Sequence, residues 1–216
     1  MRTNRITMAV IIAVFLSAAP VLAQYGDEPF IECTVGGNLI IPTGHIKNDM
    51  VPDSLNAKTN VGFDISAGYY FTNKIVAGAF LGMRNMGVEE FELAHRGWAL
   101  GLFGKYLFFD LSEKSLSPYL KLSGGFVFNK FASKVYDDGA PIYRELSYKP
   151  VLTGEAALGI HIKTNEKGAI YFELAYLTDF MDGITGEYEG TDYEWSSNNQ
   201  YIMIRAGVLF NIGSGE

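Results

Sequence analysis

Few residues in this 216-residue chain could perform acid–base or nucleophilic chemistry. The histidines are His45, His95 and His161, and the one cysteine is Cys33. A serine hydrolase needs a histidine within reach of both a serine and a carboxylate. His95 has acidic neighbours in Glu89, Glu90 and Glu92 but no serine beside it. We therefore expect no enzymatic activity, and an enzyme acting on lipid is the least favoured alternative.

An acidic segment near the C-terminus is a second candidate for chemistry. Its acidic residues are Asp179, Asp182, Glu187, Glu189, Asp192 and Glu194. Calcium prefers several oxygen ligands, but this spacing fits no EF-hand loop. The segment also carries Tyr188, Tyr193 and Trp195. We predict a solvated loop able to contact a surface ligand, and no metal or cofactor.

The remaining ionisable residues of interest occur singly within apolar and glycine-rich segments. They are Glu32, Asp64, Arg84, Lys105, Lys121, Glu155, His161, Glu173 and Arg205. Each occupies the polar side of a segment whose polarity alternates every second residue, which is the period of a β-strand with two different faces. These nine residues are therefore predicted to share one side of a sheet.

Eight such segments follow one another along the chain. They cover approximately residues 30–41, 61–71, 75–84, 98–108, 120–129, 152–163, 170–176 and 202–211. The clearest alternates Val61, Phe63 and Ile65 with Gly62 and Asp64. The third is the weakest, because Val76 and Phe80 blur its alternation.

The connections between these segments alternate in length. Short ones cover residues 72–74, 110–116 and 165–168, and long ones cover residues 43–60, 85–95, 130–147 and 181–199. Transmembrane barrels have short periplasmic turns and longer outer loops. We predict an all-β fold, an eight-stranded antiparallel up-and-down transmembrane barrel with this arrangement of turns and loops.

The composition of the two faces indicates which one meets lipid. The polar face is mostly Gly, Ser, Thr and Ala with isolated charges, which suits a narrow barrel interior. The other face is large, apolar and almost free of charge, as a lipid-facing surface must be. Aromatic residues gather near the strand ends, including Tyr69, Tyr70, Phe71, Tyr106, Phe108, Phe109, Tyr193, Trp195 and Tyr201. The alternative is a soluble barrel with an apolar ligand cavity.

The N-terminus predicts secretion. Two basic residues, Arg2 and Arg5, precede an apolar run from Met8 to Leu16, and small residues end at Ala23. This pattern predicts a signal peptide over residues 1–23 and a single barrel domain over residues 24–216. Without Arg2 and Arg5, 15 basic and 24 acidic residues give a formal charge of −9, which argues against nucleic acid as a partner.

The segments Phe30–Asn38 and Gly68–Lys74 resemble the outer-membrane barrel domain of the small OmpA/OmpX type. The resemblance implies an outer-membrane location, contact with membrane lipid and a monomer. We expect a non-enzymatic structural or surface-interaction barrel with a charge-plugged lumen. The alternative is a narrow porin-like channel for small solutes.

Strand neighbours predict the ion pairs inside this barrel. Arg205 should pair with Glu173 or Glu32, and Lys121 should lie beside Glu155. Lys105 and Lys121 should lie side by side and share a carboxylate, because adjacent like charges repel.

Overall fold

The computed structural model describes residues 31–43, 46–48, 51–55, 59–88, 93–110, 114–137, 140–165, 167–188, 191–195 and 198–212. The predicted signal peptide, the start of the mature chain and His45 lie outside these ranges. In the described part of the chain, no helix is long and apolar enough to cross a membrane.

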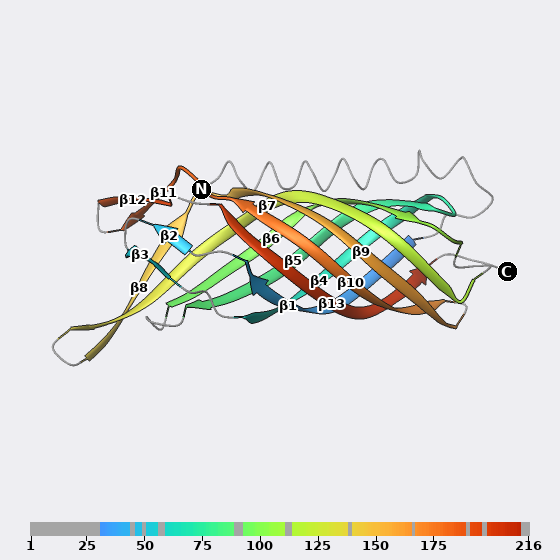
Figure 1. The fold of residues 1–216 in the computed structure, drawn as a ribbon, viewed down its shortest axis with the longest axis horizontal. Coiled ribbons are helices and arrows are strands. Elements are labelled where there is room, and N and C mark those ends of the chain that lie inside the picture. The colour runs from blue at the N-terminus through green and yellow to red at the C-terminus, as the bar shows by residue number, and fades with distance from the viewer. Residues whose placement is uncertain are drawn as a thin grey trace.

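Eight antiparallel strands close into a barrel (Figure 1). They are β1 (Ile31–Pro42), β4 (Asn60–Thr72), β5 (Ile75–Val88), β6 (Leu93–Leu107), β7 (Leu116–Asp137), β9 (Val151–Asn165), β10 (Gly168–Phe180) and β13 (Asn199–Ile212). Each strand pairs with its neighbours along the chain, and β1 pairs with β13 to close the ring. The predicted up-and-down barrel is confirmed.

The outer surface of this barrel is apolar over its whole circumference. Leu158, Leu122 and Leu174 are 62%, 58% and 57% exposed, although residues of this size are usually buried in a water-soluble protein. The alternate residues of the same strands point into the lumen and are mostly buried, as the burial pattern of β10 shows. Alternation with apolar residues outside is the arrangement of a barrel solvated by lipid.

Short turns connect the strands at one end of the barrel, which we call the turn end. Between β4 and β5, the Thr72 hydroxyl accepts hydrogen bonds from the backbone N–H groups of Lys74 and Ile75. Between β9 and β10, the Asn165 side chain accepts one from the Lys167 N–H. These side-chain caps satisfy backbone donors in turns too short to satisfy them otherwise.

The opposite end, called the outer end, carries a second set of strands. These are β2 (Ile46–Asn48), β3 (Val51–Leu55), β8 (Ala140–Tyr148), β11 (Ile184–Tyr188) and β12 (Thr191–Trp195). They pair in the order β3-β2-β12-β11-β8 and join the barrel through β7. We call them the outer sheet; they lie together beyond one mouth of the barrel (Figure 1).

The outer sheet changes the predicted connections. Residues 130–147 and 181–199 are largely β-hairpins rather than irregular loops. The predicted long loop at residues 85–95 is wrong in extent, because β5 continues to Val88 and β6 already begins at Leu93. Backbone pairing between the two strands therefore continues past the lipid-facing part of the barrel.

Candidate functional site

The lumen contains all nine of the ionisable residues singled out in the sequence. Seven are buried, namely Glu32, Arg84, Lys105, Glu155, His161, Glu173 and Arg205. The side chains of Lys121 and Asp64 are 12% and 13% exposed. All sit at inward-facing positions of the alternation, so the backbone register alone brings them into one space.

Arg205 is the centre of the largest ion-pair cluster. Its guanidinium forms hydrogen-bonded ion pairs with Glu155 and Glu173, and its Nε lies 2.9 Å from Asp64 Oδ2. Lys121 Nζ lies 3.3 Å from Glu173 Oε1 and 3.5 Å from Glu155 Oε1. Three carboxylates thus share two cations. We call Asp64, Lys121, Glu155, Glu173 and Arg205 the central cluster.

Hydrogen bonds from neutral side chains complete this cluster. Tyr119 Oη donates to Glu173 at 3.1 Å, and Asn38 Nδ2 donates to Asp64 at 3.0 Å. Buried carboxylates need such donors, because the cost of their desolvation is high when their lone pairs stay unsatisfied. The cluster and its neutral donors therefore connect six strands, β1, β4, β7, β9, β10 and β13.

Lys105 lies nearer the turn end and binds a different carboxylate. Its ammonium pairs with Glu32, which also accepts a hydrogen bond from Tyr70 Oη at 3.1 Å. Lys105 and Lys121 are register partners, yet Lys121 pairs with Glu155 and Glu173. The expectation of a shared carboxylate is wrong, because each ammonium group pairs with carboxylates that the other does not contact. Lys105 Nζ also lies 4.9 Å from the centroid of the Tyr119 ring.

A further ion pair, separate from the central cluster and from Lys105–Glu32, crosses the lumen near the outer end. Arg84 Nη1 on β5 lies 2.9 Å from Asp179 Oδ1 on β10, and 3.4 Å from Thr153 Oγ1. The two strands lie on opposite sides of the ring. Sequence reasoning placed Asp179 in the acidic loop, although it has the same parity as Glu173 on an extended strand. That parity was the signal that could have found it.

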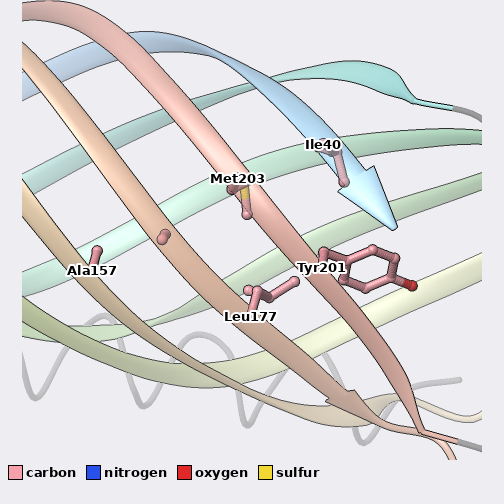
Figure 2. Close-up of a cluster of buried hydrophobic side chains, with 6 residues drawn as sticks. Ile40, Ala157, Leu177, Tyr201 and Met203 are labelled. Atoms are coloured by element: carbon pink, nitrogen blue, oxygen red, sulfur yellow. The ribbon is translucent and has the colours of Figure 1, made fainter. Parts of the chain in front are cut away.

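Two clusters of buried apolar side chains lie in the lumen beside these ion pairs. Near the turn end, Val76, Phe103, Leu107 and Tyr119 form a buried cluster against which Tyr70 and Phe80 pack. Towards the outer end, the second cluster consists of Ile40, Ala157, Ala175, Leu177, Tyr201 and Met203 (Figure 2). Two aromatic residues expected at the lipid boundary, Tyr70 and Tyr201, therefore lie in the lumen. Val76 and Phe80 blur the alternation of β5 for the same reason.

His161 lies in the lumen near the turn end and is fully buried. Its ring packs against Tyr119, with a centroid separation of 4.4 Å, and neither ring nitrogen has a hydrogen-bond partner among the described residues. The register partner of His161 is Ser117, which is also buried, but its hydroxyl donates to the Phe109 carbonyl and not to the imidazole. The described part of the chain also does not bring together three or more His, Cys, Asp or Glu side chains able to hold a metal ion.

A small cavity lies between the central cluster and Lys105. Hydroxyls of Thr34, Ser66 and Tyr171 line it. Eight strands enclose an interior narrow enough for side chains to fill.

Comparison with known proteins identifies the fold but not a family. No protein-family model matches the chain, and no curated protein matches it. A major outer membrane protein from Thermus thermophilus is 9% identical with a TM-score of 0.55, over 84% of this chain and 99% of that one. OprG from Pseudomonas aeruginosa is 11% identical with a TM-score of 0.53, over 85% and 95%.

AlkL, determined in DMPC lipid bilayers, is 12% identical with a TM-score of 0.53, over 88% of this chain and 92% of that one. Identities this low carry information about the fold alone. Together with the closed ring of strands, they confirm the predicted resemblance at the level of architecture. This chain has the fold of a small eight-stranded outer-membrane β-barrel.

Proposed function

We propose that this protein is a non-enzymatic outer-membrane barrel, closed to solutes, that anchors the outer sheet for contact with a surface ligand. The observation that carries the proposal is the succession of layers in the lumen. From the outer end to the turn end, the lumen holds the Arg84–Asp179 ion pair, an apolar cluster, the central cluster, and a second apolar cluster that packs around the Lys105–Glu32 ion pair.

Each layer blocks a different kind of solute. The apolar cluster towards the outer end opposes ions, because an ion entering it would lose its hydration without gaining a partner. The ion pairs oppose apolar solutes, because separating buried partners leaves uncompensated charges. A continuous water path would require both kinds of layer to open together.

The exterior supports the membrane placement, the predicted contact with outer-membrane lipid and the outer-membrane location. Exposed leucine, isoleucine, valine and phenylalanine side chains cover all eight barrel strands. The outer sheet supports the second half of the proposal, because β7 runs without interruption from the turn end into that sheet. A sealed barrel would serve it as a rigid anchor.

Planar-bilayer recording tests whether the lumen is closed. We expect the purified mature chain to insert without discrete conductance steps. The matched positive control is a variant with both polar layers weakened, Arg84→Ala/Arg205→Ala, which should conduct if it folds. Steps in the wild-type trace would favour the narrow channel over the sealed barrel.

A second experiment tests the role of the outer sheet. Replacing residues 182–198 with a short Gly-Ser connection removes β11 and β12 but leaves the barrel strands intact. We expect the variant to fold, as judged by a heat-modifiable band on a gel, and to lose binding of the producing cells to surfaces. Unchanged surface binding would contradict the proposed role of this sheet.

A further inference from the structure

The cavity between the central cluster and Lys105 is polar on almost every side. Strands β1, β4, β6, β7 and β10 all contribute to its lining. Apart from the ring of Phe103, each lining side chain carries a hydroxyl, an ammonium or a carboxylate group. Polar groups buried in a protein are almost always hydrogen-bonded, either to protein or to a bound molecule. This polar space deep in the lumen is therefore a candidate binding site.

The hydroxyl of Tyr171 is the strongest indication that the cavity binds a ligand. Tyr171 lines the cavity and is only 4% exposed. Its Oη has no hydrogen-bond partner among the described residues. Tyr119, the other tyrosine in the lining, donates to Glu173 at 3.1 Å. Because a buried hydroxyl without a partner is unfavourable, we expect Tyr171 to donate to a molecule in the cavity.

Other lining groups retain hydrogen-bonding capacity. Thr34 Oγ1 and Ser66 Oγ lie 2.6 Å apart, so one hydroxyl donates to the other and the second proton stays available. The hydrogen bond and the ion pair of Asp64 both use Oδ2, which leaves Oδ1 as an acceptor. The Lys105 ammonium has three protons and pairs with one carboxylate. Donors and acceptors therefore both surround the cavity.

The charges in the lining favour a neutral ligand. Lys105 and Lys121 contribute two ammonium groups, and Asp64 and Glu173 contribute two carboxylates. The ammonium groups would repel a cation, and the carboxylates would repel an anion. A neutral molecule that both donates and accepts hydrogen bonds suits such a lining. Water is the smallest such molecule, and buried waters commonly satisfy polar groups that have no protein partner.

We propose that this cavity binds a structural water. The water accepts a hydrogen bond from Tyr171 Oη and donates one to the hydroxyl pair of Thr34 and Ser66. Since Lys105 lines the same cavity, the water joins the Lys105–Glu32 ion pair to the central cluster in one hydrogen-bonded network. This inference does not rest on the proposed function, because a fixed water can occupy a lumen that is closed or one that conducts.

A crystal structure of the mature chain, refolded in detergent, tests this site at a resolution that shows ordered waters. Further crystals are soaked in sodium bromide or rubidium chloride, because both heavy ions give anomalous peaks. We expect a water peak about 2.7–3.0 Å from Tyr171 Oη, in contact with Thr34 or Ser66, and no anomalous peak in the cavity. The proposal is overturned by a bromide or rubidium peak there, or by a Tyr171 hydroxyl that bonds only to protein.

Substitutions test the partners of the water. Tyr171→Phe removes the hydroxyl with little change in volume and should abolish the water peak. The matched control is Tyr176→Phe on the same strand, at a position 48% exposed on the lipid-facing side, which should keep the peak. An undiminished peak in Tyr171→Phe would overturn the assignment. If that variant does not give a heat-modifiable band, Thr34→Val tests the same site and should also lose the peak.

Conductance separates this inference from the proposed function. A protein that conducts but shows the water peak would refute the closed lumen alone. A protein that does not conduct and lacks the peak would refute the water site alone.

Discussion

Replacing Arg205 tests whether the central cluster stabilises the barrel. The substitution Arg205→Met keeps most of the side-chain volume and removes the guanidinium that binds Asp64, Glu155 and Glu173. Lys121 then remains as the one cation beside three carboxylates in this cluster. Breaking a buried ion pair by removing one partner costs about 3–5 kcal/mol. The Arg205 side chain is only 6% exposed, so solvent screening reduces this figure little.

The size of the loss should depend on the charge left behind. The double variant Arg205→Met/Glu155→Gln removes one carboxylate as well and returns the cluster to its original net charge. We expect it to be more stable than Arg205→Met alone, by roughly 1–3 kcal/mol, because residues within one ion-pair network couple by such amounts.

Urea unfolding in phospholipid vesicles, followed by tryptophan fluorescence, measures these differences. The matched control is Ile204→Met on the same strand, one residue away and 47% exposed to lipid. It should change the free energy of unfolding by about 0.5 kcal/mol or less. The reasoning is refuted if Arg205→Met is as stable as Ile204→Met, or if the double variant is no more stable than Arg205→Met.

Three further experiments test the lipid-facing and lumen-facing sides of the barrel. Leu158 lies at the middle of β9 and is 62% exposed, so Leu158→Arg should lower the free energy of unfolding in vesicles by about 2–4 kcal/mol. Gln200→Arg, at the outer end, should lower it by about 1 kcal/mol or less. Equal effects of the two substitutions would contradict contact of Leu158 with lipid. Gly36→Ala would place a Cβ 2.0 Å from Tyr171 Oη, so it should cost about 1–3 kcal/mol. Adding Tyr171→Phe should recover part of that loss in the same urea titration, and no recovery would mean that the two residues do not meet. Cys33 should react with a water-soluble maleimide only after unfolding, because it lies on the lipid face; mass spectrometry showing rapid labelling of the inserted protein would contradict this.

The fold was predictable because two independent sequence patterns agreed. The alternation along Val61–Phe71 predicted which face of that strand is apolar. The same alternation in seven other segments predicted that the barrel has eight strands. Ion pairs between neighbouring strands, such as Arg205 with Glu173, followed from the ring order alone. The ion pairs Lys105–Glu32 and Arg84–Asp179 could not be predicted from the ring order. They cross the lumen, and such contacts depend on strand tilt and on the reach of the side chains.

The apolar layers of the lumen were hidden for a related reason. Alternation assigns every large apolar residue to the lipid face, so Leu177 and Met203 carried no signal of their own. The outer sheet was missed because its strands are short and pair mainly outside the barrel ring. Short hairpins depend on turn residues and neighbours more than on periodicity.

The length of β7 has a mechanical consequence for any ligand that pulls on the outer sheet. β8 connects that sheet to the last eight residues of β7, and β7, which is 22 residues long in all, reaches the turn end. A pull along β7 loads its ladders with β6 and β9 in shear, so that many backbone hydrogen bonds resist together. In the hairpin of β11 and β12, the backbone hydrogen bonds can break one pair at a time. Under force, this hairpin would therefore unfold before the barrel strands separate.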